Sequence, residues 1–180
     1  PRRIRATFLA VAAAMAVVLA VAAPAGALTW DAPVDVAATT GNGQQQVAVA
    51  PDGAVTAVWY HYDGGSNIIQ AATRRGGSNT WGAVSDLSAA TVAAADSPQI
   101  AIASDGSATA VWARSNGSKT IIQAATRPAG GSWGAVSDLS ATGQNATVPQ
   151  VAIAADGVAT AVWGRFDGAH NIIQIGRAHV

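Results

Sequence analysis

The side chains that could do acid–base or metal chemistry are few and isolated. The chain has ten Asp, no Glu, three His and no Cys. His61 and His170 lie 109 positions apart, and neither has a second ligand at the short spacing of a metal site. Hydrolysis of a glycosidic bond by carboxyl groups needs a matched pair, which no spacing in this sequence provides. We therefore expect no catalytic residues, no metal site and no cofactor.

One polar motif recurs, however. The pattern Asp-Gly-x-x-Thr-Ala-Val-Trp occurs three times. Its aspartate–glycine pairs are Asp52-Gly53, Asp105-Gly106 and Asp156-Gly157, and its tryptophans are Trp59, Trp112 and Trp163. Asp-Gly suits a tight hairpin turn that needs positive φ, so we predict a structural turn role for these pairs. We predict that the tryptophans fill a core between sheets, the alternative being exposed aromatic rings that stack on a ligand.

The motif belongs to a longer repeat. The three tryptophans are spaced by 53 and 51 residues. A second block begins Ile-Ile-Gln at Ile68, Ile121 and Ile172. A third block, Trp-Gly-Ala-Val-Ser-Asp-Leu-Ser, occurs at 81–88 and 133–140, with a weaker copy at 30–37. A period of about 50 residues is typical of a propeller, a solenoid or an array.

We predict that each repeat unit forms four short strands. Val or Ile alternates with Ala in the first, and Thr, Val and Trp fill the second, with Gly-rich turns between strands. The predicted fold is all-β, with four-stranded antiparallel blades over residues 28–174. We expect a lone fourth strand at 30–37, then two full sets and one set of three. This makes about three blades of an incomplete propeller, so we expect further repeats downstream, because propellers carry four to eight blades.

The first residues have the character of an export signal. Three arginines lie within positions 1–5, an apolar run covers about 8–23, and Ala25-Gly26-Ala27 offers a small-residue cleavage site. We therefore predict that residues 1–27 are a signal peptide, the alternative being a single membrane anchor. We expect a secreted or cell-envelope protein of bacterial type, with no membrane contact after cleavage.

The last six residues, Ile-Gly-Arg-Ala-His-Val at 175–180, depart from the Ala-Ala-Thr-Arg that follows Gln70 and Gln123 in the other copies. They coincide with the translation of a widely used sequencing adapter. Our hypothesis is that the natural sequence ends near Gln174 and that 175–180 is an artefact.

Charge narrows the possible partners. The whole chain has zero formal charge, but residues 28–174 contain six basic side chains against ten Asp, which gives −4. Nucleic-acid binding requires clustered Lys and Arg, so no nucleic-acid partner is expected. The acidic balance also disfavours anionic polymers.

The three blocks together resemble the tandem repeats of about 50 residues found in secreted bacterial β-propeller proteins, which are loosely similar to sialidase or Asp-box propellers. The Asp-box runs Ser-x-Asp-x-Gly-x-Thr-Trp. Here Gly follows the Asp directly and Trp comes seven residues after it, so the match is partial. The resemblance implies a structural role for the repeated Asp. A sialidase-like site would also need Glu, which is absent, and a Tyr nucleophile, whereas Tyr60 and Tyr62 occur in one repeat only.

These observations favour a secreted module whose loops bind carbohydrate, a cell-wall polymer or an extracellular protein, without catalysis in this chain. The candidate binding residues are His61, Arg114 and Arg165, which share one strand-end register and could line a common rim; alternatively they are solvated strand ends. Two other functions stay open: the N-terminal part of a sialidase-like glycoside hydrolase or lyase with its catalytic blades further along, and a structural surface spacer. A full-length propeller would be a monomer.

Overall fold

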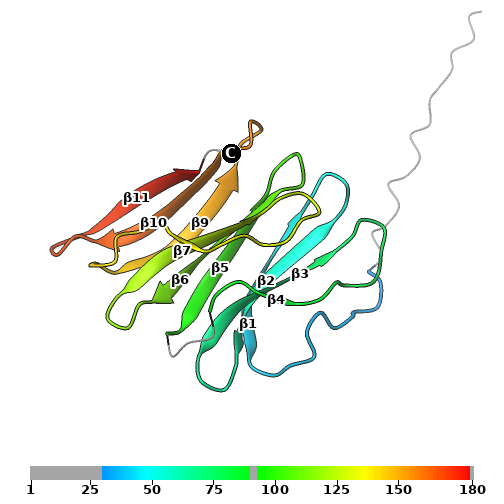
Figure 1. The fold of residues 1–180 in the computed structure, drawn as a ribbon, viewed down its shortest axis with the longest axis horizontal. Coiled ribbons are helices and arrows are strands. Elements are labelled where there is room, and N and C mark those ends of the chain that lie inside the picture. The colour runs from blue at the N-terminus through cyan, green and yellow to red at the C-terminus, as the bar shows by residue number, and fades with distance from the viewer. Residues whose placement is uncertain (1–29, 90–92, 179–180) are drawn as a thin grey trace, which may run out of the picture. The chain divides into compact units, whose positions relative to one another are not determined.

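The computed structural model describes residues 30–89 and 93–178 (Figure 1). The predicted signal peptide, 1–27, lies outside the described residues, as do the last two positions of the 175–180 segment. The chain divides into two units, Pro1–Val34 and Asp35–Val180, and every strand belongs to the second. Within the described residues, no helix is long and apolar enough to cross a membrane.

The described residues form eleven strands and no helix. Nine strands have eight residues each, and two have only two. The strands are β1 (Asn42–Val49), β2 (Val55–Tyr62), β3 (Asn67–Arg74), β4 (Ser85–Asp86), β5 (Ala95–Ile102), β6 (Ala108–Ser115), β7 (Thr120–Arg127), β8 (Ser137–Asp138), β9 (Ala146–Ile153), β10 (Ala159–Phe166) and β11 (Asn171–Ala178).

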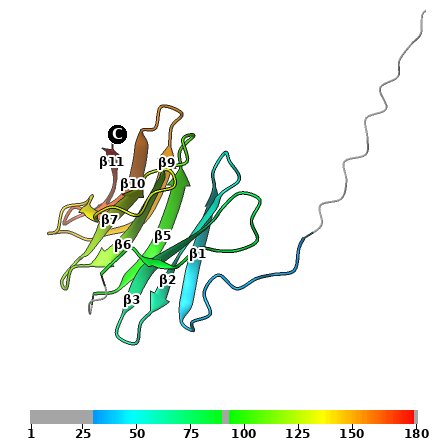
Figure 2. The ribbon, with the colours of Figure 1, turned by 45° about the vertical axis from the view of Figure 1, so that its right-hand side comes forward.

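The strands form three antiparallel sheets that follow one another along the chain. Their orders are β1-β2-β3-β4, β5-β6-β7-β8 and β9-β10-β11. Figures 1 and 2 show the sheets side by side, with β5 lying between β1 and β9. The prediction of an all-β protein built from antiparallel, blade-like sheets is confirmed, and the three sheets do not close a ring.

Two details of the predicted strands are wrong. Residues 30–37 form no strand, although their letters resemble the fourth strand of the other units. The fourth strands themselves shrink to Ser85–Asp86 and Ser137–Asp138, each joined to its neighbour by two residue pairs. The physical reason is that a strand forms only where a neighbouring backbone accepts its hydrogen bonds, and sequence pattern alone does not supply that neighbour.

Packing between sheets uses two different faces. We call the face of β2 and β3 that carries Val58 and Ile69, with its equivalents, the forward face, and the face that carries Trp59, with its equivalents, the rear face. The forward face of the first sheet packs on the rear face of the second, burying Trp112 completely. The forward face of the second sheet covers Trp163 of the third in the same way.

The buried tryptophans are also fixed by polar contacts. Nε1 of Trp112 donates to Oε1 of Gln123 at 3.2 Å, and Nε1 of Trp163 donates to Oε1 of Gln174 at 3.0 Å. Trp59 is buried too, with 4% of its surface exposed, yet its Nε1 has no partner. Small residues on the same face, Ala110 and Ala125 around Trp112, leave room for the indole ring.

Removing methyl groups from the forward face should cost more than removing them elsewhere. Val111 is fully buried against the third sheet, whereas Val136 of the same blade is 39% exposed. We expect Val111→Ala to lower the free energy of unfolding by about 2 kcal/mol, and Val136→Ala by about 0.5 kcal/mol or less. Urea unfolding followed by tryptophan fluorescence measures both variants, and equal losses would contradict the packing described here.

Candidate functional site

The first strands of the three sheets, β1, β5 and β9, lie next to one another and carry the same irregularity. Pairing with the following strand slips by one residue between Gly43 and Gln46 in β1, and the slip recurs in β5 and β9. At each slip one residue other than glycine has positive φ: Gln44 (52°), Ser97 (52°) and Val148 (53°). Each first strand therefore contains a β-bulge at an equivalent position.

Two prolines help to explain these bulges. Pro98 and Pro149 directly follow the positive-φ residues, and both are fully buried. Proline cannot donate a hydrogen bond to a neighbouring strand, so it fits a bulge better than a regular ladder position. A β-branched residue such as Val148 with positive φ costs about 1–3 kcal/mol, which the surrounding packing must offset.

The bulges open onto a shared hollow of about 240 Å³. It is lined by Gln44, Gln46, Ser97, Pro98, Gln99, Val148, Pro149 and Gln150. We call it the inner hollow. None of its eight lining residues is charged, and four are glutamines, whose amides both donate and accept hydrogen bonds. Oε1 of Gln44 accepts from the backbone N–H of Ser97 at 2.5 Å, so one bulge is bonded directly to the next.

Sequence reasoning missed this hollow. The repeated glutamines Gln46, Gln99 and Gln150 were visible as the first letter of each repeat. A proline directly before two of them was the available signal, since proline inside an apparent strand points to an edge or a bulge. Alternation of apolar residues alone does not reveal an inserted residue.

The three predicted rim residues occupy equivalent positions near the ends of β2, β6 and β10. Nδ1 of His61 hydrogen-bonds to Oδ1 of Asn42 at 3.0 Å, and a guanidinium nitrogen of Arg114 donates to the carbonyl of Ala89 at 3.3 Å. Arg165 lies near Asp167, whose pKa its charge helps to lower. His61 is bonded within its own sheet, whereas the partner of Arg114 lies in the segment between the first and second sheets. None of the three lines the inner hollow. Their binding role stays a prediction.

The loops beyond these strand ends share one construction. Oδ1 of Asp63 accepts from the backbone N–H groups of Gly65 and Ser66, at 2.8 and 2.9 Å. Asp167 does the same with the N–H groups of Ala169 and His170, and the amide oxygen of Asn116 replaces the carboxylate in the second sheet. These bonds lower the pKa of Asp63, with Ser66 the largest cause, and the pKa of Asp167, with His170 the largest cause.

The repeated Asp-Gly pairs lie at the opposite ends of these strands, in the first hairpin of each sheet. Oδ1 of Asp52, Asp105 and Asp156 accepts from the backbone N–H two residues later, at 2.9, 2.8 and 3.0 Å. The glycines that follow have φ of 79°, 87° and 86°. Each aspartate is thus bonded within its own turn. The pKa of Asp105 is lowered by its bonds to the side chain and backbone of Ser107.

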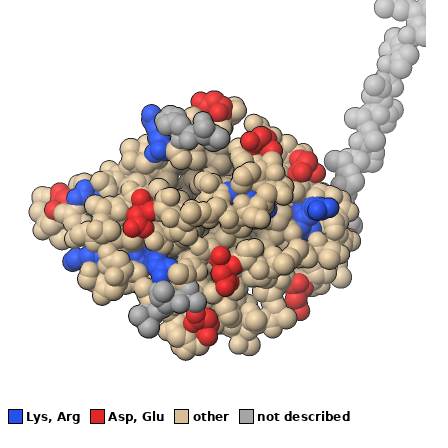
Figure 3. Space-filling model, viewed as in Figure 1, with Lys and Arg blue, Asp and Glu red and all other residues tan. Residues whose placement is uncertain are grey.

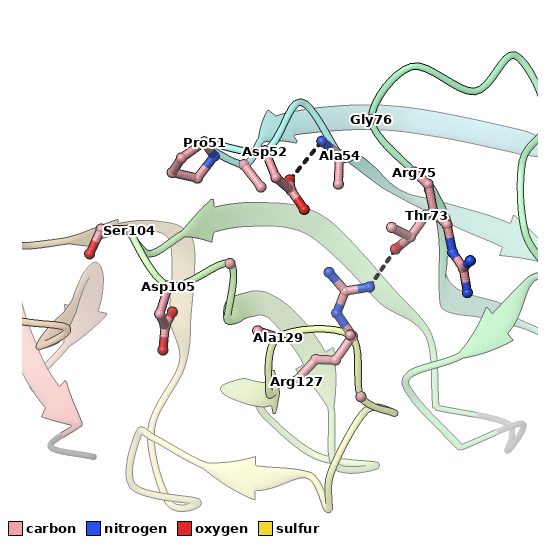
Figure 4. A pocket seen from close by; sticks show the side chains of 14 residues that line it. Pro51, Asp52, Ala54, Thr73, Arg75, Gly76, Ser104, Asp105, Arg127 and Ala129 are labelled. Atoms are coloured by element: carbon pink, nitrogen blue, oxygen red, sulfur yellow. Dashed lines mark hydrogen bonds between the residues drawn. The ribbon is translucent and has the colours of Figure 1, made fainter.

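Two of these hairpins border a larger hollow of about 660 Å³, shown in Figure 4, which we call the hairpin hollow. Asp52 and Asp105 come from the two hairpins, and Arg75 and Arg127 also line it. The loop after β3 passes so close to the first hairpin that a Cβ at position 76 would lie 2.1 Å from the carbonyl oxygen of Asp52. Glycine is therefore required there.

Arg127 connects two sheets across the hairpin hollow. From the end of β7 its guanidinium donates to Oγ1 of Thr73 at 2.6 Å (Figure 4). It also donates to Oγ1 of Thr56 at 3.2 Å, and both threonines belong to the first sheet. It also lies 5.6 Å from the ring centre of Trp133 in its own sheet. Burial lowers its pKa, and its Nε has no hydrogen-bond partner. Arg127 therefore joins the first and second sheets, and we call Arg127 with Thr56 and Thr73 the inter-sheet clamp.

On the face of the molecule drawn in Figure 3, charged side chains do not gather into one patch. Figure 3 shows acidic and basic side chains dispersed over the visible face, with wide uncharged areas between them. Among residues 30–89 and 93–178, no group of three or more His, Cys, Asp or Glu side chains is placed to hold a metal ion.

Several solved structures are similar to this chain. The endo-arabinase from Bacteroides thetaiotaomicron aligns at 14% identity, covering 77% of this chain and 56% of that one, with a TM-score of 0.51. A leech intramolecular trans-sialidase aligns at 14% identity over 74% of this chain and 23% of that one, with a TM-score of 0.46. An α-L-arabinanase from Penicillium chrysogenum aligns at 10% identity over 71% and 42%, with a TM-score of 0.45.

These likenesses bear on the fold alone. The likeness to the endo-arabinase, a β-propeller enzyme, agrees with the blade-like sheets. The chain spans 56% of the length of the endo-arabinase. No family model matches the chain, and no curated protein matches it.

Removing the clamp should loosen the contact between the first two sheets. We expect Arg127→Met to lower the free energy of unfolding by about 2 kcal/mol, because two charge-assisted hydrogen bonds between sheets are lost. Arg75→Met is the matched control, since Arg75 lines the same hollow but is exposed. Urea unfolding of both variants tests this, and an equal effect of the two substitutions would refute the clamp.

The aspartates of the strand-end loops should make the free energy of unfolding decrease at acidic pH. Because the folded pKa values of Asp63 and Asp167 lie below the ordinary 3.8, their contribution is fully present above that value and is lost as pH falls through the folded pKa. We expect the double variant Asp63→Asn, Asp167→Asn to keep its fold, because Asn116 makes the same bonds in the equivalent loop. Below about pH 4 the variant should lose less stability than the unsubstituted protein. Thermal unfolding between mildly acidic and strongly acidic buffers measures this. Parallel losses in the variant and the unsubstituted protein would contradict it.

Proposed function

We propose that this protein is a secreted binding module that holds a neutral carbohydrate at the inner hollow and does not hydrolyse it. The observation that carries the proposal is the repetition of one bulge in β1, β5 and β9, which brings glutamines from three sheets to one hollow. Backbone strain repeated at three equivalent positions is more typical of a functional site than of a packing accident.

The chemistry of the hollow fits a sugar. Neutral amides can donate to and accept from the hydroxyl groups of a sugar without the desolvation cost of a charged side chain. Val148, which is 68% exposed, adds apolar surface beside the amides. The excess of Asp over basic side chains in residues 28–174 makes an anionic sugar a poorer ligand.

The same lining supports binding without turnover. No carboxylate borders the inner hollow, and the chain contains no Glu. The two hairpin carboxylates that border the hairpin hollow, those of Asp52 and Asp105, are each bonded within their own turn. A pair of free carboxyl groups across a scissile bond is therefore missing from both hollows. Location outside the cell rests on the signal-like residues 1–27.

Titration calorimetry with defined oligosaccharides tests the proposal. Neutral arabino-oligosaccharides are the first probe, because the similar structure with a TM-score of 0.51 is an endo-arabinase, and sialyllactose is the anionic comparison. We expect saturable binding of a neutral oligosaccharide, weaker binding of the sialylated one, and no release of shorter sugars on prolonged incubation. Turnover, or the absence of saturable binding across a panel of neutral glycans, would overturn the proposal.

Substitution within the hollow localises the binding. Gln99→Ala and Gln150→Ala should each weaken it about fivefold to tenfold, the usual net value of one hydrogen bond. Asn79→Ala is the matched control, because Asn79 is an exposed amide outside the inner hollow. An equal effect of Asn79→Ala would place the binding site elsewhere.

A further inference from the structure

The bulges of β5 and β9 are equivalent in position but differ in one hydrogen bond. In each strand the residue with positive φ, Ser97 or Val148, lies within the slip of the ladder and has no paired residue in the neighbouring strand. The extra residue of a bulge stands outside the regular pairing, which frees its backbone N–H for another acceptor. The proline that follows in each strand has no N–H of its own. Each of these bulges therefore offers one backbone donor.

In β5 a side chain of the preceding sheet accepts from this donor. The backbone N–H of Ser97 donates to Oε1 of Gln44 at 2.5 Å. Gln44 is itself the positive-φ residue of β1, and it lies one repeat, 53 positions, before Ser97. The glutamine side chain is thus long enough to reach from one bulge to the next. Its tip is an amide carried on a methylene group, which is chemically close to acetamide.

In β9 the equivalent side chain is too short. β9 lies beside β5 as β5 lies beside β1 (Figure 1). The residue one repeat before Val148 is Ser97, whose side chain is two carbon atoms shorter than that of Gln44. Among residues 30–89 and 93–178, no side chain accepts from the backbone N–H of Val148. Because backbone N–H groups are obligatory hydrogen-bonding groups, this one is a donor for a ligand in the inner hollow.

The inner hollow places suitable groups around that donor. Ser97 and Val148 both line it, together with Gln99 and Gln150. The hydroxyl of Ser97 bonds to no other described residue, so it is a second donor on the same lining. The exposed side chain of Val148 is apolar and fits a methyl group. A carbonyl oxygen, a methyl group and neighbouring hydroxyls are therefore the ligand groups that this lining matches.

We propose that the inner hollow selects neutral N-acetylated sugars, with the carbonyl oxygen of an acetamido group accepting from the backbone N–H of Val148. The acetamido group then makes at β9 the bond that the amide of Gln44 makes at β5. Its methyl group contacts the side chain of Val148, and the glutamine amides meet the ring hydroxyls. The inference rests on the proposed function, because it names the class of sugar for the same hollow.

Two neutral trisaccharides test the class of sugar. Tri-N-acetylchitotriose and cellotriose have the same rings and linkages, and they differ at the second carbon of each ring, which carries an acetamido group in one and a hydroxyl in the other. We expect calorimetry to give a dissociation constant about tenfold lower for the acetylated trisaccharide, because one hydrogen bond and one methyl contact are added.

The outcomes separate this inference from the proposed function. Binding of both trisaccharides with equal affinity would overturn the selectivity for acetamido groups and leave sugar binding at the inner hollow standing. Binding of neither, together with no binding across the panel of neutral glycans, would overturn both.

Substitution of Ser97 tests the position of the acetamido group. Ser97→Gln gives β5 the residue that β1 has at Gln44, so the new amide should bond to the N–H of Val148 and occupy the acetamido position. We expect binding of tri-N-acetylchitotriose to weaken about tenfold or more, with a smaller change for cellotriose. Ser97→Ala is the matched control, because alanine does not reach that N–H and the backbone bond to Gln44 is kept. Equal losses in the two variants would refute the assignment.

The amide proton of Val148 gives a readout that needs no sugar. In Ser97→Gln its NMR signal should move downfield and its exchange with water should slow, towards the behaviour of the Ser97 amide proton in the unsubstituted protein. Addition of tri-N-acetylchitotriose to the unsubstituted protein should change it in the same direction, and cellotriose should change it less. A Val148 amide proton that responds neither to Ser97→Gln nor to the acetylated sugar would overturn the proposal.

Discussion

Each sheet of this protein is apolar on both faces, and that constraint governs the rest of the structure. A sheet with one polar face needs only one neighbour, which covers its apolar face. Here Trp112 lies on the rear face and Val111 on the forward face of the same strand, and both are fully buried. Burial of both faces requires a neighbour on each side, so the sheets must stack in series. The small residues around each indole ring set how closely the next sheet approaches.

Because the sheets pack in series, each residue that recurs in the repeat forms a row with its equivalents in the other sheets. The Asp-Gly hairpins fall at one end of the strands and the Asp or Asn loops at the other. The glutamines of the bulges form a third row, along the first strands. A site made in this way is assembled from one residue per sheet. It differs from a catalytic constellation, in which each residue has a distinct role.

The sequence predicts the parts of the structure that depend on local pattern. Alternation across Val55–Tyr62 predicts a strand and its two faces, and the spacing of the tryptophans predicts the number of sheets. The bulges escape prediction because one inserted residue shifts the alternation, and in β5 and β9 no glycine lies at the slip. In β1 a glycine, Gly43, lies there, but Gln44 lacks the following proline. The strand predicted at 30–37 is absent for another reason. Its residue types suit a strand, but no strand edge among the described residues pairs with them. His61, Arg114 and Arg165 share a register as predicted, while their contacts differ: His61 bonds to Asn42 of its own sheet, and Arg114 bonds to Ala89 between the first and second sheets.

The inner hollow and the packing of the sheets are energetically linked. Positive φ at Val148 is unfavourable in an isolated strand, and burial of Pro149 against the neighbouring sheet is one of the contacts that offset it. The bond from Ser97 to Gln44 likewise exists only when two sheets are packed together. The hollow is therefore a property of the stacked sheets and is absent from any single one. A ligand that contacts glutamines of all three sheets binds only the stacked state, and by mass action it stabilises that state in proportion to the logarithm of its concentration above the dissociation constant. Binding at the first strands and cohesion between the sheets must then rise and fall together.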